Sequence, residues 1–248
     1  LNQFLNITPH KELAFNIPEI NCLHAGMTRI GVVRSEGEWE VTECPDWCTV
    51  SPMKGGKDKR EEVTVTVSPM TQGSGNREGR IVFRLKGSDY TTYTTVAQYD
   101  YEHAEDKEIV LQEATAGGRE IPLFIVGDGF SAASIADGTY LEQMKQQMEH
   151  FFNIEPYRTY RNYFTVFTSV AVSPESGIQM AGTLIQSNKF NTRLDEFGFH
   201  ADIEQVKNYA QRVSSRAADF GRLTVLVLAN HSAFLSTTVR DWSGCNIT

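Results

Sequence analysis

The hydrophobic pattern of the chain changes character near residue 103. Before that point, short runs alternate apolar and polar residues, and valines alternate with threonines at Glu62–Ser68. A period of two is typical of a strand with one face in a core and the other in water. Turn residues separate the runs, and no helical pattern lies between them, so residues 1–103 are predicted to form an all-β sandwich. The expected strands are Thr28–Val33, Trp39–Thr42, Trp47–Pro52, Glu62–Ser68, Arg80–Leu85 and Tyr90–Tyr99.

From residue 121 onward, apolar runs alternate with helical patterns. Ile121–Val126 is a short apolar run, typical of a buried strand, that leads into Gly127-Asp128-Gly129. The helix that follows is expected to begin with a capping box, in which Thr139 caps the helix and Glu142 reaches back. A helical spacing predicts a buried face made of Leu141, Met144, Met148 and Phe151 or Phe152.

Two more strands and one more helix are expected in this half. They are the strand Tyr163–Ser173, the helix Asp202–Phe220 and the apolar strand Leu223–Leu228. The helix is expected to bury Ile203, Val206, Ala210, Val213 and Ala217. Residues 178–201 are expected to be irregular and to border a cleft. The order strand, helix, strand, helix, strand predicts an α/β layered domain over residues 121–248. Residues 104–120 are predicted to be a linker or a connecting strand around Ile109–Leu111.

Composition narrows the functional classes only a little. The chain has 248 residues and a formal net charge of -8. An acidic balance argues against a nucleic-acid-binding face, which needs basic residues, and against docking on anionic lipid. No apolar run approaches the roughly 18 residues that a transmembrane helix needs. The N-terminus lacks the features of a signal peptide and does not begin with Met, so we expect a trimmed form of a longer precursor.

The four cysteines do not form a metal motif. Cys44 and Cys48 are separated by three residues, and no second pair follows at the spacing of a zinc ribbon. Two interpretations stay open at this level, namely free or half-buried thiols and a disulfide that closes a tight loop around Trp47.

Candidate chemistry gathers after the predicted strands. None of the six histidines forms an H-x-x-x-H pair, and neither a G-x-S-x-G elbow nor a phosphate-binding loop is present. Asp128 follows the first strand, Glu175 and Ser176 follow the second, and Asn230 and His231 follow the third. Loops after parallel strands converge on the ligand crevice of an α/β sheet, so these five residues are the candidates for a substrate cleft. Asp128 could instead serve only to organise the backbone of its loop.

Residues 25–100 resemble the BACON module, an immunoglobulin-like sandwich. The resemblance rests on Trp39-Glu40-Val41, Pro45-Asp46-Trp47, Val63–Val67, Arg77-Glu78-Gly79-Arg80-Ile81 and Val96-Ala97-Gln98 in that order. The resemblance implies a module placed before secreted hydrolases, which either binds carbohydrate or acts as a spacer. The two tryptophans are expected to lie in the core rather than to form an exposed platform.

Residues 109–248 resemble the IgA-peptidase-like zinc metallopeptidase family. The matching residues are Ile121–Phe130, Phe151-Phe152, Glu155-Pro156-Tyr157, Tyr160, Tyr163–Phe167, Val172–Gly177 and Leu226–Asn230. The resemblance implies a secreted, periplasmic or cell-surface enzyme in which zinc, held by an H-E-x-x-H helix, activates water against a peptide bond. A protein or glycoprotein would be the substrate, and carbohydrate is a second candidate partner.

The chain departs from that family at the metal site. The zinc helix should follow the strand that ends near Asn230 by some tens of residues, and the sequence contains no H-E-x-x-H. We therefore expect an incomplete zincin-like peptidase domain, truncated before its metal-binding helix. No catalytic or metal-binding residue is assigned in this chain, and zinc is expected only in the intact protein. The alternative is a non-catalytic surface protein that binds glycan or protein.

Overall fold

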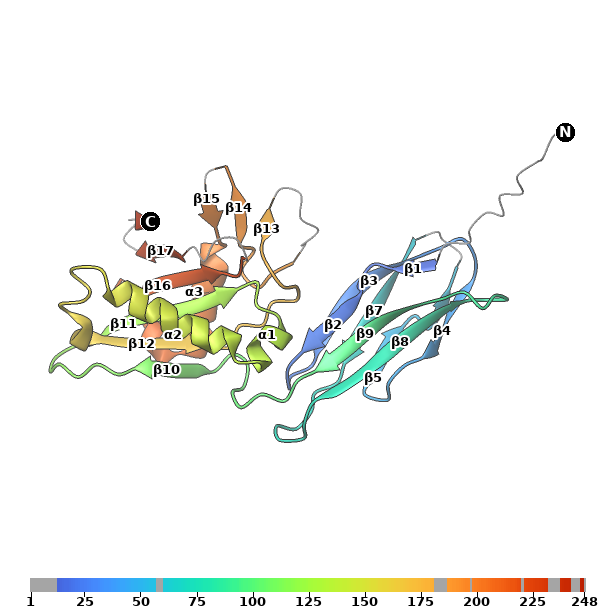
Figure 1. Cartoon of the computed structure of the whole chain (residues 1–248), viewed down its shortest axis with the longest axis horizontal. Coiled ribbons are helices and arrows are strands. Elements are labelled where there is room, and N and C mark those ends of the chain that lie inside the picture. Colours follow the sequence, from blue (N-terminus) through green and yellow to red (C-terminus); the bar gives the residue numbers. More distant parts are fainter. Residues whose placement is uncertain are drawn as a thin grey trace. The chain divides into compact units, whose positions relative to one another are not determined.

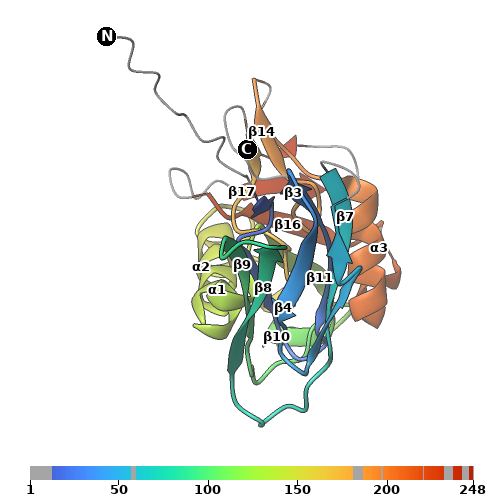
Figure 2. The same ribbon diagram turned by 90° about the vertical axis from the view of Figure 1, so that its right-hand side faces the viewer.

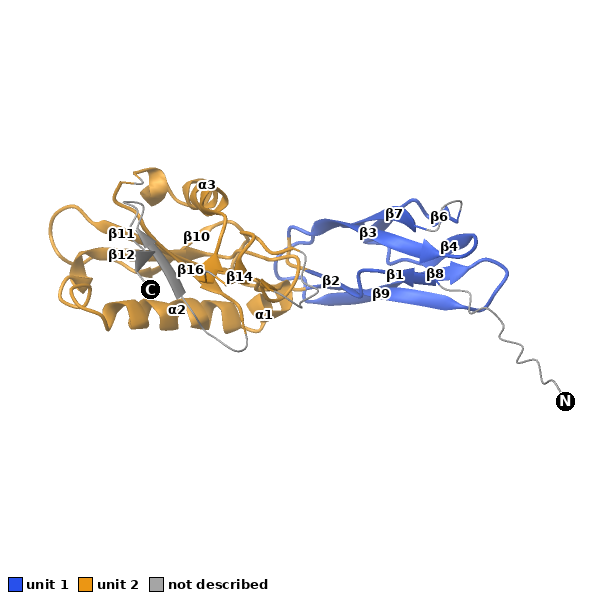
Figure 3. Cartoon of the chain, turned by 90° about the horizontal axis from the view of Figure 1, so that it is seen from above, with its two compact units in different colours: residues 1–21, 25–98 blue, residues 22–24, 99–248 orange. Residues whose placement is uncertain are grey.

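The fold is described from a computed structural model of the chain. The structure describes residues 13–56, 60–180, 187–196, 198–219 and 221–231, together with the backbone of 237–241 and 246–247. The chain divides into two compact units, which Figure 3 distinguishes by colour. Unit 1 consists of Leu1–Asn21 and Ala25–Gln98, and unit 2 consists of Cys22–His24 and Tyr99–Thr248.

Unit 1 contains two β-sheets, as the period-two pattern predicted (Figure 1). The first has the order β1-β3-β7-β5 and the second has the order β2-β9-β8-β4-β6. Their bounds are β1 Leu13–Phe15, β2 Glu19–Cys22, β3 Met27–Ser35, β4 Trp39–Glu43, β5 Cys48–Ser51, β6 Lys54–Gly55, β7 Arg60–Val67, β8 Arg77–Leu85 and β9 Thr91–Gln98. Strands β1, β2 and β6 were not predicted, because they are too short to show an alternation of apolar and polar residues.

The valines of β7 line the core of unit 1. Val63 and Val65 are fully buried, and the ring centroid of Phe15 on β1 lies 4.9 Å from that of Phe83 on β8. Residues from both sheets therefore meet in one core, which is the arrangement of a sandwich. The β-rich, immunoglobulin-like character of this half is confirmed.

The two tryptophans differ in burial. Trp39 is 1% exposed and donates from Nε1 to Oε2 of Glu61 at 2.8 Å, so its predicted core position is confirmed. Trp47 is half-buried, and the guanidinium of Arg77 lies 4.6 Å from the centroid of its ring. The predicted core position therefore holds for Trp39 and only in part for Trp47.

The cysteines that the structure describes, Cys22, Cys44 and Cys48, form no disulfide bond. Burial raises the pKa of Cys48 to about 12, which keeps this thiol protonated and unreactive at neutral pH. The free-thiol interpretation holds for these residues, and Cys245 lies outside the described part of the chain.

Unit 2 is built on a six-stranded sheet of order β10-β12-β11-β16-β17-β18. The strands are β10 Glu108–Gln112, β11 Ile121–Asp128, β12 Phe164–Ser169, β16 Thr224–Ala229, β17 Thr237–Asp241 and β18 Asn246–Ile247. The three central strands β12, β11 and β16 are parallel, and β10 and β17 flank them in the antiparallel sense. The connecting strand expected around Ile109–Leu111 is β10.

Helices pack on both faces of this sheet, as Figure 2 shows for α2 and α3. The helices are α1 Ala132–Ala136, α2 Thr139–Phe152 and α3 Ile203–Val213, with 3-10 turns η1 Arg161–Tyr163 and η2 Ser215–Ala218. Leu123 and Ile125 of β11 pack in the core on the α2 side, whereas Phe124 and Val126 pack in the core on the α3 side. A strand buried on both faces explains why this run is apolar throughout.

Three expectations for the helices and strands of unit 2 are wrong in detail. Thr139 does not cap α2, because Gly138 is the N-cap residue and makes no side-chain cap bond. The helix expected to extend to residue 220 ends at Val213, since Ser214 adopts an extended conformation and its hydroxyl accepts from the N–H of Arg216. The strand expected over Tyr163–Ser173 is shorter and begins only at Phe164.

Residues 178–201 are not irregular throughout. They contain a small sheet of order β13-β14-β15, formed by Gln179–Met180, Arg193–Asp195 and Gly198–His200. The sequence could not show these strands, because each has only two or three residues.

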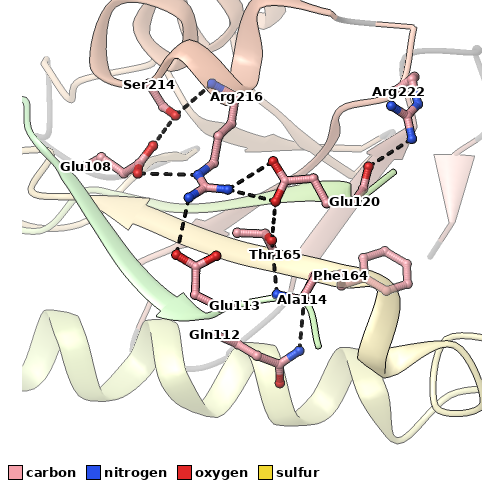
Figure 4. Close-up of polar contacts among 10 residues, drawn as sticks. All are labelled: Glu108, Gln112, Glu113, Ala114, Glu120, Phe164, Thr165, Ser214, Arg216 and Arg222. Carbon is pink, nitrogen blue, oxygen red and sulfur yellow. Dashed lines mark hydrogen bonds and ion pairs between the residues drawn. The ribbon is translucent and has the colours of Figure 1, made fainter. Parts of the chain in front are cut away.

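Arg216 on η2 ties the connecting strand to the body of unit 2 (Figure 4). Its guanidinium lies 3.5, 3.2 and 2.7 Å from the carboxylates of Glu108, Glu113 and Glu120. Glu120 also accepts from the hydroxyl of Thr165 at 2.5 Å. These contacts join β10, β12, η2 and the start of β11. The residues before β11 are thus part of the domain, not a free linker.

Candidate functional site

The candidate site lies where the three parallel strands of unit 2 end. Asp128 is the last residue of β11 and pairs with Ala229, the last residue of β16. The backbone N–H of Asn230 donates to the carbonyl oxygen of Asp128 at 2.9 Å. Because the strands run in the same direction, the residues that follow β11, β12 and β16 share one edge of the sheet.

The Asp128 carboxylate is fully buried and surrounded by donors. Its Oδ1 accepts from the N–H of Gly129 at 2.9 Å, the hydroxyl of Ser173 at 2.8 Å and the N–H of Lys189 at 2.7 Å. Its Oδ2 accepts from the N–H groups of Phe190 at 3.0 Å and Thr192 at 3.1 Å. Hydrogen bonds from several N–H groups can offset the cost of burying a carboxylate. Asp128 therefore organises the backbone around it.

A second contact joins the same three loops. The carbonyl oxygen of Gly129 accepts from the N–H of Gly177 at 2.7 Å and from Nδ2 of Asn230 at 2.8 Å. Gly129 has a φ of +78°, and a Cβ at this position would lie 2.4 Å from the carbonyl oxygen of Gly177. Only glycine satisfies both conditions, which explains the second glycine of Gly127-Asp128-Gly129.

The remaining candidate residues lie around this contact. Glu175 is partly exposed and Ser176 is exposed, in the turn that precedes Gly177. His231 is partly exposed, and its Nε2 lies 2.9 Å from Sδ of Met180 on β13. The structure thus places all five candidates at the end of a strand or on the loop that follows it, at one edge of the sheet, and it bonds Asn230 directly to the Asp128–Gly129 turn.

Sequence reasoning missed the partners of Asp128. Ser173, Lys189, Phe190 and Thr192 lie between 45 and 64 residues further along the chain. Three of them contribute a backbone N–H, which every residue except proline carries. No pattern in the sequence could have identified them.

The described residues do not fit a zinc ion. Among them, no group of three or more His, Cys, Asp or Glu side chains could hold a metal. Both oxygens of Asp128 face N–H or O–H donors, which compete with a cation for the same lone pairs. Asp128 is therefore no metal ligand in this arrangement.

Comparison with known families assigns both halves of the chain. Residues 109–238 match the family described as IgA Peptidase M64, and residues 37–99 match BACON, described as a putative N-terminal binding domain. The first match spans more than half of the sequence and encloses the ends of β11, β12 and β16. The chain belongs to the IgA Peptidase M64 family. It carries a metallopeptidase-like domain preceded by a BACON domain, and both resemblances seen in the sequence are confirmed.

Other comparisons add little. No curated protein matches the chain. A Bacteroides ovatus GH5 xyloglucanase is 17% identical, with a TM-score of 0.33 over 44% of this chain and 22% of that chain. A Clostridium perfringens family 123 glycoside hydrolase is 8% identical, with a TM-score of 0.29 over 91% of this chain and 48% of that one. Likenesses of this size carry no argument about fold or activity. The chain spans about a fifth of the length of the xyloglucanase.

No helix of the described residues is long and apolar enough to cross a membrane.

Proposed function

We propose that the intact protein is a secreted or cell-surface zinc metallopeptidase that acts on a protein or glycoprotein. This chain contributes the BACON module and the front part of the zincin-like catalytic domain. The observation that supports the proposal most is the IgA Peptidase M64 match, because its residues include all the loops at the edge of the parallel sheet. The families of both domains are typical of extracellular or surface proteins, which supports the location.

In this proposal, the loops at the strand ends form one wall of the substrate cleft. Asp128, which is fully buried, and Asn230 join the loops of the wall through hydrogen bonds. Glu175, Ser176 and His231 are at least partly exposed. A peptide in the crevice would meet the exposed side chains and not the buried carboxylate. Glu175, Ser176 and His231 would contact the substrate, whereas Asp128 and Asn230 would support the loops.

We place the zinc ligands outside the described residues. Among the described residues, no cluster of His, Cys, Asp or Glu side chains could hold the ion. A decisive test is the coding sequence that continues past Thr248. An H-E-x-x-H helix encoded some tens of residues downstream is expected. A stop codon directly after Thr248 would leave the non-catalytic glycan- or protein-binding alternative in its place.

Metal analysis of the purified chain gives a second test. After dialysis we expect well below one zinc per chain by mass spectrometry of the metal, because no ligand set is available in the described residues. One zinc per chain, removable by a chelator, would contradict the placement of the ligands. A form extended through an H-E-x-x-H segment, purified in parallel, is the positive control and should hold one zinc.

A further inference from the structure

The segment Lys189–Thr192, here called the amide nest, wraps around the Asp128 carboxylate. Three of its four residues donate a backbone N–H to that carboxylate, at 2.7 to 3.1 Å. Asn191, the residue without such a bond, has a φ of +52°. A left-handed residue within a turn directs neighbouring N–H groups to the same side, which is the geometry of an anion-binding nest. The carboxylate of Asp128 occupies the place that a bound anion takes in such nests.

One side chain of this stretch also braces the nest, because Nδ2 of Asn188 donates to the carbonyl oxygen of Thr192 at 2.8 Å. Other side-chain atoms here are unsatisfied. Asn188 is 6% exposed and Thr192 is 2% exposed, yet Oδ1 of Asn188 and Oγ1 of Thr192 have no hydrogen-bond partner among the described residues. Burying such atoms is unfavourable, so other contacts must compensate. The Asp128 bonds to the nest are charge-assisted, and these are stronger than bonds between neutral groups.

The nest is continuous with the small sheet. The carbonyl oxygen of Thr192 accepts from the N–H of Gln179 at 3.1 Å, and β14 begins at the next residue, Arg193, opposite Gln179. Met180 of β13 then contacts His231 at the end of β16. A change in the path of the nest would therefore move β13 and the surroundings of His231.

We propose that Asp128 is a positioning residue whose negative charge sets the path of the amide nest and, through it, of β13 and β14. That β13 and β14 form part of a cleft wall rests on the proposed function. That the charge of Asp128 positions these strands does not rest on it. The inference differs from a general packing role, because it requires the anion and not merely the shape of the side chain.

The experiment uses the full chain and amide hydrogen exchange, read by mass spectrometry. In Asp128→Ala and Asp128→Asn, peptides covering Lys189–Thr192 should exchange about 10- to 100-fold faster than in the wild type. Peptides from β7 and β8, which belong to unit 1 and not to the unit of the nest, should not change. Adding sodium formate to Asp128→Ala should restore slow exchange, because formate can take the vacant place of the carboxylate. Sodium chloride at equal ionic strength should not, and Asp128→Asn should respond to neither salt.

The matched control is Asp137→Ala. Asp137 is exposed, and its carboxylate accepts a single N–H, from Thr139. Its loss should leave exchange in the nest unchanged, with or without formate. Unchanged exchange in folded Asp128→Asn, or equal effects of formate and chloride on Asp128→Ala, would overturn the proposal.

A second pair of variants covers the case in which the Asp128 variants do not fold. Asn191 is exposed, so Asn191→Gly should keep the left-handed turn and slow exchange, whereas Asn191→Val should accelerate exchange at Lys189 and Phe190. Equal exchange in both variants would contradict the nest.

The two proposals can fail separately. Formate-dependent exchange together with a stop codon after Thr248 would leave the positioning role intact and remove the peptidase. An encoded zinc helix together with exchange that does not depend on formate would support the peptidase and remove the positioning role.

Discussion

At the scale of single residues, Tyr140 shows how one hydroxyl joins two strands of unit 2. Tyr140 is fully buried on α2, and its hydroxyl donates to the carbonyl oxygen of Ser169 at 2.6 Å and accepts from the N–H of Gly127 at 3.2 Å. Burial raises the pKa of Tyr140 to about 12. Gly127 leaves room for the ring, since a Cβ there would lie 2.8 Å from it.

We expect Tyr140→Phe to lower the free energy of unfolding by about 1–3 kcal/mol, because it removes two buried hydrogen bonds to the backbone of β11 and β12. Urea unfolding followed by circular dichroism measures the change. Tyr163→Phe is the control, because Tyr163 is 43% exposed and should cost little. Equal stability of wild type and Tyr140→Phe would contradict the role of the hydroxyl.

The raised pKa of Tyr140 also sets the sign of a pH effect. The folded protein keeps this phenol protonated to higher pH than the unfolded chain, whose tyrosines ionise near about pH 10. The contribution of Tyr140 to the free energy of unfolding is complete below about pH 10 and is lost as the pH rises through about 12. In Tyr140→Phe, this part of the alkaline loss of stability should be absent.

Asp128 illustrates the difference between a residue type and its role. A glycine-flanked aspartate after a buried strand is compatible with a substrate contact, a metal ligand or a backbone organiser. The five donors around the carboxylate select the third role, and four of them are backbone N–H groups that the sequence does not identify.

At the scale of elements, the start of α2 shows how a correct local pattern can still mislead. Thr139 and Glu142 have the spacing of a capping box, but the helix begins at Thr139 with Gly138 as its N-cap. The N–H of Thr139 instead donates to Oδ1 of Asp137 at 2.9 Å. The left-handed φ of Gly138, +88°, provides the turn between α1 and α2.

We expect Gly138→Ala to destabilise the protein by about 1 kcal/mol, because a left-handed φ disfavours any residue with a Cβ. Gly117→Ala is a matched control. A Cβ at either position would meet no atom within 4 Å, but only Gly138 has a left-handed φ. Thermal unfolding of the two variants side by side makes the comparison, and equal melting temperatures would show that φ is not the cause.

At the scale of the whole molecule, residues 104–120 lie within unit 2. The sequence left a linker and a connecting strand open as alternatives. The structure has a strand here, because β10 pairs with β12, and Glu108, Glu113 and Glu120 contact Arg216. Burial opposes the charge of Arg216, but the three carboxylates outweigh it and raise the pKa of the guanidinium. Only the turn Gly117–Arg119 within this stretch is continuously exposed.

We propose that limited proteolysis of the native protein will cut between residues 100 and 120, with trypsin cleaving after Arg119. Mass spectrometry identifies the fragments. They should co-elute in size-exclusion chromatography, since β10 stays hydrogen-bonded to β12. Arg119→Gln is the control and should abolish this cut. A resistant chain with no cut between 100 and 120 would contradict the accessibility of the turn Gly117–Arg119.

The sequence by itself determined the β-sandwich character of unit 1 and the buried central strands of unit 2. Alternation of valine with threonine is visible in β7, and the apolar runs of β11 and β16 are long enough to be recognised as buried strands. The motifs also sufficed to identify both families. These features are local, so a window of a few residues contains the information.

Only the tertiary structure decided what the candidate site residues do. The role of Asp128 depends on N–H groups more than 60 residues away, and the role of Gly129 depends on how closely Gly177 approaches it. Backbone hydrogen bonds are made by position and not by residue type, so they leave no mark in the sequence. For that reason the strand and the turn could be predicted, whereas the buried anion and its nest could not.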